Sequence, residues 1–418
     1  MSMQKKVKLK RSLNLLDAVS ICIGATIGAG IFVVVGLAAG LAGPGLVLSV
    51  LIAALVSSFT ALSFAELSSA IPKEGGAYEY IYELVSPFFG FLTGWMVIFG
   101  QIFVGAAVSL GLATYLALFI PLPMKLLAVL ACLFFISLNL TGVKQSSEVN
   151  DALVVLKVIA LCIFIVAGVP HIQASNFSNL FPNGFFGVIS GAALIFFAYI
   201  GYASVATISE EVENPKKTIP LSILIGLGIS TALYLLVSFT AVGVVNYTTL
   251  SASGTPLADA MKLTGNELAT FAVSLGAIFA TSSVLLTTIL GVSRISFSMA
   301  RNKQIPNLIN SLHPKFQTPY ISIILTGLVM VALALFGDLK QVFSLASFSV
   351  IVTHILVNYS AIKLRAHPKF KIPLRPIPPI LGIVSCSALL FFLPAETWVM
   401  AGVVLFLGIV FYLIKNRF

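Results

Sequence analysis

The chain has 418 residues, of which 59% are hydrophobic and only 9% are charged, with a formal net charge of +10. Soluble domains carry about 25% charged residues, so this composition excludes a soluble protein. The positive charge does not indicate nucleic-acid binding, because the charged residues are segregated: none occurs in 18–65, 158–209 or 218–258. The composition predicts an all-α integral membrane protein that lies in the lipid bilayer.

Twelve hydrophobic segments follow one another along the chain, and each is long enough to suggest a transmembrane helix, which needs about 20 apolar residues. The predicted spans are 14–41, 45–70, 88–119, 124–142, 151–170, 185–209, 219–245, 268–294, 319–336, 340–362, 377–393 and 396–414. The first residues are basic and the first span lacks a small-residue cleavage site, so we expect no signal peptide.

The basic residues predict the orientation of these spans. With twelve spans and a cytoplasmic N-terminus, 20 of the 24 lysines and arginines fall in cytoplasmic segments. Only Lys125, Lys262 and Lys340 fall outside, and Lys157 lies within a span. Positively charged loops mark the cytoplasmic side. We therefore expect a multi-pass protein of the cell membrane with both termini in the cytoplasm.

The first span contains three glycines in seven residues, Gly24, Gly28 and Gly30. Each costs a helix interior about 1 kcal/mol relative to alanine, which favours an interrupted helix. The spacing of Gly24 and Gly28 is also typical of close packing between membrane helices. The stretch alone leaves both interpretations open.

The fifth span carries the intramembrane lysine, Lys157, six residues beyond Asp151. At 1.5 Å per residue it lies about 9 Å inside the cytoplasmic boundary. An ammonium inside a membrane is costly and by default indicates function. The alternative is that its long side chain reaches back to the interface.

The sixth span contains a short echo of the first. Residues 198–201 read AYIG and residues 25–28 read ATIG. Five spans precede the sixth, so it enters the membrane from the opposite face. Inverted repeats with first helices interrupted near the midplane are a transporter design. Free N–H groups at such a break favour a carboxylate, and free carbonyls favour an amine.

Three motifs together carry a resemblance to the amino acid–polyamine–organocation family of permeases. They read GATIGAGIF at 24–32, IPKEGGAYEY at 71–80, and FFAYIGYAS at 196–204 running into EEVENPKKTIP at 210–220. The resemblance covers the whole chain. It implies the fold of the bacterial leucine transporter: two inverted five-helix repeats with discontinuous first and sixth helices, plus two peripheral helices. It also implies alternating access and small amine-bearing substrates.

This resemblance implies a division of the chain and a site at the two breaks. The division is a basic tail at 1–13, a first repeat at 14–170, an external loop at 171–184, a second repeat at 185–362, a basic cytoplasmic loop at 363–376, and peripheral helices with a short tail at 377–418. The carboxylate of an amino acid would be held by backbone amides around Thr26, Gly28, Ala29 and Gly30. Its amine would be held by the carbonyls of Ile27, Phe197, Ala198 and Ile200. The pocket wall or gate would include Tyr199 and Tyr202.

The resemblance also implies a role for Lys157. Sodium-coupled relatives place a cation between the first and eighth helices, and a lysine of proton-coupled members stands in its place. The partners of Lys157 would be carbonyls near Gly24 and hydroxyls among Thr281, Ser282 and Ser283. Loss of its proton would remove the charge that joins these helices. We therefore expect proton coupling through Lys157, with no metal and no cofactor.

Polar residues elsewhere have weaker interpretations. Glu66, Glu210 and Glu211 are expected near cytoplasmic helix ends, where they form either an inner gate with Lys10 or Arg11 or ordinary interfacial pairs. Gln101 either faces the substrate or hydrogen-bonds between helices. The four cysteines lie in apolar runs and are expected to pack there.

Neither predicted break contains an acidic or basic residue, which favours neutral amino acids with broad selectivity, because a cationic substrate needs a buried carboxylate. A cationic amino acid or polyamine permease and an obligate exchanger remain alternatives. We expect no enzyme, because no HExxH motif or Ser/His constellation occurs in the sequence. A channel has no use for a protonatable lysine, and only flux separates a receptor from a transporter. The sequence thus predicts a secondary active importer with no evident protein partner.

Overall fold

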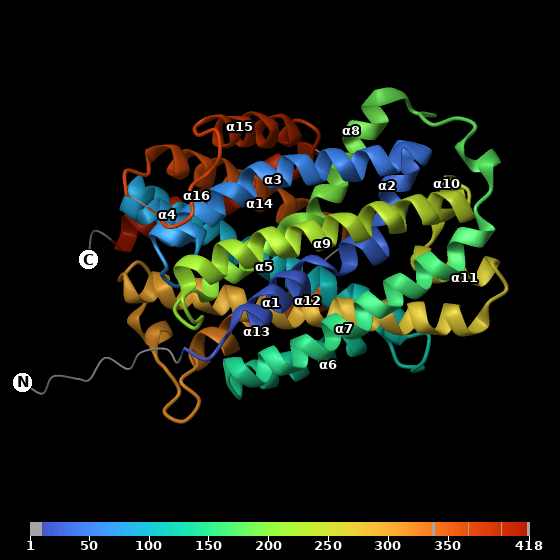
Figure 1. The fold of residues 1–418 in the computed structure, drawn as a ribbon. Helices are drawn as coiled ribbons and strands as arrows, with labels where there is room; N and C mark the ends of the chain where they lie inside the picture. Colours follow the sequence, from blue (N-terminus) through green and yellow to red (C-terminus); the bar gives the residue numbers. More distant parts are fainter. Residues whose placement is uncertain (1–10, 337–338, 367, 394, 416–418) are drawn as a thin grey trace, which may run out of the picture.

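The computed structural model describes residues 11–336, 339–366, 368–393 and 395–415, which form a helical bundle (Figure 1). Over these residues one isolated β-bridge occurs, a parallel pairing of Leu13 with Val212. Several basic residues that support the predicted orientation lie outside the described part of the chain, namely Lys5, Lys6, Lys8, Lys10 and Arg417.

Every predicted hydrophobic segment contains a helix. The long ones are α3 (Leu46–Ala70), α5 (Pro87–Leu116), α7 (Val143–Gly168), α9 (Pro215–Val244), α12 (Glu267–Arg301), α14 (Leu339–Lys363) and α16 (Ala395–Lys415). The first segment divides into α1 (Leu15–Thr26), a π-helical turn η1 (Gly30–Val34) and α2 (Val35–Ala42). The sixth consists of α8 (Gly184–Ile195) and the 3₁₀-helix η5 (Phe196–Ile208). Short helices between them are α4 (Ala77–Leu84), α10 (Tyr247–Ala252) and α11 (Pro256–Leu263).

Length and composition separate these helices into two groups. Within the described residues, eight helical stretches are long and apolar enough to cross a membrane, one of them the continuous run Leu15–Ala70. Three apolar helices are shorter: α6 (Met124–Leu140), α13 (Tyr320–Phe336) and α15 (Ile377–Leu390). The 14 residues of α15 rise about 21 Å, less than the roughly 30 Å of a bilayer core. The structure therefore supports a protein that crosses the membrane many times.

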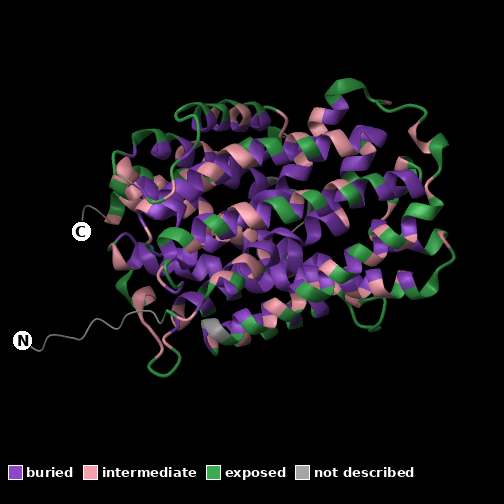
Figure 2. Cartoon of the chain, viewed as in Figure 1, coloured by how far each residue is buried: buried purple, intermediate pink, exposed green. Residues whose placement is uncertain are grey.

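Burial follows the pattern expected of a bundle surrounded by lipid. The buried residues gather along the middle of the bundle, and the exposed ones lie at its periphery and end loops (Figure 2). Large apolar side chains are exposed on the outer helices, including Phe134, Val155, Val399 and Phe406. Soluble monomers rarely expose so much contiguous apolar surface. The outer faces are therefore suited to contact with acyl chains.

Helices from the two halves of the chain pack against each other in pairs. The central pair is α5 with α12, and α3 packs along α9. In addition, α6 contacts α13, and α1 contacts η5. Each pair joins helices at corresponding positions in the first and second five segments.

Contacts between loops define the two ends of the bundle. The end that carries both ends of the described chain, here the terminal end, brings Leu13 to Val212 and Lys415 to the carbonyl of Lys303. At the opposite end, here the distal end, the amide of Gly45 donates to Leu180. The first and last spans therefore begin and end on the same side of the bundle.

Candidate functional site

The site begins where α1 stops. Asn14 and Asp17 form a capping box that starts this helix, and the helix ends at Thr26 because Ile27 adopts an extended conformation with φ −81° and ψ 102°. Regular structure resumes only at the π-helical turn from Gly30. A helix end leaves its last carbonyls without intrahelical partners, and single π-turns often occur at functional sites.

The ammonium of Lys157 lies against the carbonyls at this end of α1. Its Nζ donates to the carbonyl oxygens of Ile23 at 3.1 Å, Gly24 at 2.9 Å and Ile27 at 2.6 Å. The side chain is fully buried. A positive charge is favourable at a helix C-terminus, where the carbonyl dipoles converge. The lysine on α7 thus closes the end of α1.

The third element at this point is α12, through Ser283. The Lys157 Nζ donates to the Ser283 Oγ at 2.7 Å, and that oxygen lies 3.0 Å from the Gly24 carbonyl. Of the three expected hydroxyls, Ser283 is the one in contact with the ammonium. The Thr281 hydroxyl instead donates within α12, to Ala277 at 2.7 Å. Successive helix residues point about 100° apart, so Thr281 and Ser282 face other directions.

The break also leaves backbone donors free. Among the described residues, the N–H groups of Gly28 and Ala29 have no hydrogen-bond acceptor, whereas those of Ile31 and Phe32 both bond to the Gly28 carbonyl at 3.2 Å. Free N–H groups at the start of a helical turn form a site suited to an anion. The break therefore presents donors next to the buried cation.

The opposite wall is η5, which differs from the expected second break. The α-helix of the sixth span does not unwind; it tightens into 13 residues of 3₁₀-helix from Phe196. Such long 3₁₀ runs are uncommon, and side chains three residues apart eclipse one another. Two of the three rows of η5 line the cavities described below: Phe197, Ile200 and Ala203, and Ala198, Gly201 and Ser204.

Tyr199 and Tyr202 belong to the third row, which faces away from the break. Both are fully buried. The ring of Tyr199 packs edge-on against Tyr234 of α9, 5.1 Å between centroids, and that of Tyr202 packs on Phe64 of α3. The two tyrosines expected at the pocket wall therefore lie behind it.

Tyr234 joins the two walls. Its hydroxyl lies 2.7 Å from the Thr26 carbonyl and 3.0 Å from the Ala198 carbonyl. The hydroxyl holds one proton and donates to one acceptor at a time, so the two carbonyls share it. The Ala198 carbonyl, which was expected to bind an amine, already accepts from Tyr234. The Ile27 carbonyl, with the same expected role, already accepts from Lys157.

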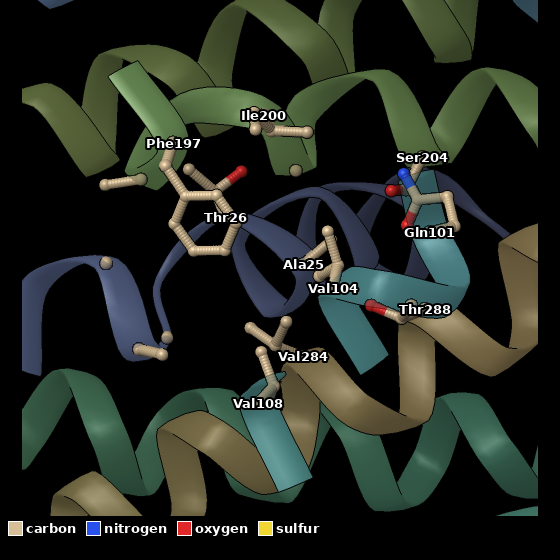
Figure 3. Close-up of a pocket in the computed structure, with 15 residues that line it drawn as sticks. Ala25, Thr26, Gln101, Val104, Val108, Phe197, Ile200, Ser204, Val284 and Thr288 are labelled. Atoms are coloured by element: carbon tan, nitrogen blue, oxygen red, sulfur yellow. The ribbon is translucent and has the colours of Figure 1, made fainter. Parts of the chain in front are cut away.

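A small cavity lies between the two walls (Figure 3). Its volume is about 20 Å³, close to the space of one water. In the view of Figure 3, Phe197 and Ile200 face Thr26 across it, with Val284 of α12 on another side. Its lining is Ala25, Thr26, Gly28, Ala29, Gly30, Gln101, Val104, Val108, Phe197, Ala198, Ile200, Gly201, Ser204, Val284 and Thr288. No charged side chain is among these residues, so the cavity suits an uncharged group.

The structure brings most of the expected substrate residues to this cavity. Thr26, Gly28, Ala29, Gly30, Phe197, Ala198 and Ile200 line it. Ile27 turns its carbonyl to Lys157 instead. The lining from α5 and α12, such as Val104 and Thr288, was missed, because nothing in these apolar sequences marks the inward face. Gln101 was considered in both roles, and it lines the cavity.

A second cavity of about 40 Å³ continues from the first toward the terminal end. The two share Gln101, Ile200 and Ser204, and the second extends to Thr207 and Ala77. Beyond it the loop 71–76 closes the path, since the Gly75 amide donates to the Thr207 carbonyl at 3.3 Å.

Ion pairs hold this terminal end together. The Arg301 guanidinium makes a bidentate contact with Glu210 at 2.9 and 2.8 Å, and Arg294 Nη2 lies 2.9 Å from Glu211 Oε1. Arg375 lies 3.6 Å from Glu66. The three glutamates thus pair with these arginines rather than with Arg11, and Lys10 lies outside the described residues. The pairs join segments that meet where the cavity path ends.

An interrupted helix inside a membrane bundle, with free backbone donors beside a buried cation, defines a class of membrane transporters. The family model described as amino acid permease matches residues 13–413, and the chain belongs to this family. The match confirms the resemblance found in the sequence. The protein is a membrane transporter.

Relatives extend over most or all of the chain. The methylthioribose transporter of Bacillus subtilis (strain 168) is 32% identical over 100% of this chain and 96% of its own length. The branched-chain amino acid permease BcaP of the same organism is 32% identical over 98% of this chain and 94% of its own. The vacuolar cationic amino acid transporter 2 of Arabidopsis thaliana is 32% identical over 88% of this chain and 62% of its own.

Proposed function

We propose that this protein imports neutral amino acids across the cell membrane, with broad selectivity, by proton-coupled alternating access. The observation that carries the proposal is the placement of Lys157 on the C-terminal carbonyls of α1 and on Ser283. One titratable group there joins three helices at the edge of the substrate break.

The chemistry of the ammonium supports coupling. A charged lysine has three N–H donors for its four oxygen neighbours, and the helix dipole favours its charge. A neutral amine has two N–H donors and a lone pair that carbonyl oxygens repel. Loss of the proton therefore weakens the contact between α1, α7 and α12. A proton that enters from outside would restore it, which links proton movement to the movement of α1.

The substrate would lie at the break of α1. Its carboxylate would accept from the free amides of Gly28 and Ala29, and from those around Thr26 and Gly30. Its amine would reach the carbonyls of Phe197 and Ile200 on the facing wall of the cavity, while those of Ile27 and Ala198 accept from Lys157 and Tyr234. A cavity of about 20 Å³ is far smaller than an amino acid, so binding requires the walls to separate. This fits a transporter that changes shape in each cycle.

The cavity lining supports a neutral side chain. None of the fifteen residues around it is charged, and a buried cationic substrate needs a carboxylate partner. Relatives named for cationic amino acids make a cationic substrate the second candidate. An obligate exchanger is disfavoured, because exchange makes no use of a proton at Lys157.

We further propose twelve spans in two inverted five-helix repeats, at 14–170 and 185–362, with both termini in the cytoplasm. The pairing of α1 with η5, α3 with α9, α5 with α12 and α6 with α13 supports an internal two-fold relation. The shared position of the first and last described residues supports an even number of spans. Lysines and arginines at the terminal end, such as Lys216 and Lys369, support its cytoplasmic assignment.

Competition tests the substrate class. In reconstituted vesicles, unlabelled leucine and alanine are expected to reduce uptake of labelled alanine strongly, while arginine and putrescine leave it almost unchanged. Methylthioribose in the same panel tests whether this chain also recognises the compound for which its Bacillus subtilis relative is named. Stronger competition by arginine than by leucine would overturn the neutral assignment in favour of the cationic candidate.

A further inference from the structure

A buried carboxyl group at the terminal end has no part in the mechanism above. Glu74 lies in the loop 71–76, which is wedged between the end of η5 and α12. Its amide donates to Glu210 Oε1 at 3.3 Å, and its carbonyl accepts from the Ser298 hydroxyl at 3.2 Å. The side chain is 0% exposed. Among the described residues, neither of its carboxyl oxygens has a hydrogen-bond donor.

The charges around Glu74 leave it without a cation of its own. Arg301 is bound at both oxygens of Glu210, and the buried Arg294 is bound to Glu211. On the neighbouring helix α4, Glu79 accepts from Asn302 at 2.8 Å and from the Ser298 hydroxyl, and Glu83 pairs with Lys73. Among these described carboxyl groups, Glu74 and Glu79 have no cation partner, and Glu74 differs from Glu79 in that neither of its carboxyl oxygens has a hydrogen-bond donor.

These surroundings decide where a proton binds. Burial raises the pKa of Glu74 well above its ordinary value, and the charges of Glu211 and Glu210 add to this, against the smaller opposing effects of Arg294 and Arg301. At Glu210 burial also acts to raise the pKa, but the hydrogen bond and charge of Arg301 outweigh it and the pKa is lowered. Of these two carboxyl groups, Glu74 is therefore the one that favours a bound proton.

We propose that Glu74 is a second proton-binding site, occupied while the terminal end is closed and emptied into the cytoplasm when loop 71–76 leaves α12. The group that binds the proton is a carboxyl group at the terminal end, and this site is separate from the ammonium of Lys157. The proposal rests on the proposed function, because it assigns the terminal end to the cytoplasm and to substrate release.

The sign of the effect follows from linkage. The pKa of Glu74 is raised in the closed state relative to an open state in which the carboxyl meets water. The stabilisation of the closed state is full below the ordinary glutamate pKa and is lost as the pH rises through the raised value. Alkaline cytoplasm therefore favours opening, and acid cytoplasm keeps the end closed. An importer driven by protons works with an interior more alkaline than the outside, which is the direction that favours release.

Glu74→Gln tests the site, because glutamine copies the protonated carboxyl in size and has no charge. In vesicles of one orientation with the terminal end inside, wild-type uptake is expected to rise as the internal pH rises at fixed external pH. Glu74→Gln is expected to lose this dependence and to stay at the slow rate of acid-loaded wild type. Glu213→Gln removes an exposed carboxylate from the neighbouring segment and is expected to keep the wild-type dependence. Glu74→Asp retains a titratable group and is expected to keep a dependence on internal pH.

Infrared spectroscopy gives a readout that does not depend on transport. The wild-type protein at neutral pH is expected to show a protonated carboxyl band that is weaker in Glu74→Gln. A wild-type spectrum without such a band overturns the proposal even if the variant fails to fold. Glu74→Gln uptake with unchanged dependence on internal pH overturns it while amino-acid import stands. Absence of amino-acid uptake by the wild type at every internal pH would instead reject the proposed function.

Discussion

At the scale of single residues, the account depends on how a buried ammonium is satisfied. Lys157 has no carboxylate partner among the described residues; three carbonyls and one hydroxyl surround it. Such a site stabilises the charge through oriented dipoles, and it holds several helices only while the charge is present. This property distinguishes Lys157 from a surface lysine.

Lys157→Ala is expected to abolish the accumulation of amino acids driven by a pH gradient, because no proton then joins α1 to α7 and α12. Downhill flux can persist. The measurement is uptake at several external pH values in vesicles. The control, Lys262→Ala, removes an exposed lysine of α11 and should leave both rate and pH dependence unchanged. Unaltered pH dependence in Lys157→Ala would remove Lys157 from the coupling step.

Tyr234→Phe is expected to lower stability by about 1–3 kcal/mol, because the buried carbonyls of Thr26 and Ala198 lose their shared donor. Transport should slow, because the break of α1 and η5 are no longer held in a fixed relative position. Tyr199→Phe is the matched control, since that hydroxyl bridges neither wall. Thermal unfolding of the purified variants, with uptake beside it, gives the comparison. Equal effects of the two substitutions would show that the Tyr234 hydroxyl does not stabilise the protein by joining the two walls.

At the scale of elements, close approach of backbones holds the site together. A Cβ added to Gly30 would lie 2.5 Å from the Ala198 Cα, and one added to Gly28 would lie 2.2 Å from a methyl of Val284. Both glycines are therefore needed for helix packing, independently of any role in substrate binding. A bulky Gly30→Val change therefore cannot separate loss of binding from loss of packing.

The two glycines are expected to respond differently to alanine. Gly30→Ala presses on the backbone of η5 and should cost about 1–3 kcal/mol with no simple rescue, as overpacking does. Gly28→Ala presses on a side chain, so Val284→Ala in the same protein should restore much of the lost stability. Thermal unfolding of the single and double variants measures this. Rescue of Gly30→Ala by Val284→Ala would contradict the geometry.

The sequence predicted the break in the first span better than it predicted the conformation of η5. Glycines and a buried lysine mark the break of the first span, because each is costly in a membrane helix without a reason. The 3₁₀ form of η5 carried no such signal, since its dihedral angles lie close to those of an α-helix. The rotation of Tyr199 and Tyr202 away from the break depends on that tighter period, so their position could not be predicted.

At the scale of the whole molecule, segregated charge and hydrophobic length were enough to predict a helical membrane bundle, and the family match agrees with it. The facing sides of α5 and α12 could not be predicted, because spans this apolar lack the polar face that marks orientation in soluble helices. Tyr234 was missed for a similar reason: a tyrosine in an apolar run has no local sign of its distant partners.

Topology gives a prediction at this scale. Single cysteines at Lys217, near the terminal end, and at Lys262, near the distal end, should react with a membrane-impermeant thiol reagent from opposite sides. In intact cells Lys262→Cys should be labelled, and Lys217→Cys only after lysis. A chain with the four native cysteines replaced provides the background. Labelling of both positions in intact cells would contradict a span between them with the terminal end in the cytoplasm.

The central claim is that a proton gradient drives neutral amino-acid import through this protein. The most direct test is uptake of labelled alanine and leucine into reconstituted vesicles, with and without an imposed gradient, acid outside. The account predicts transient accumulation above the external concentration with the gradient, equilibration without it, and loss of accumulation in Lys157→Ala. Uptake that requires amino acid inside the vesicles and ignores the gradient would contradict the claim and identify an exchanger.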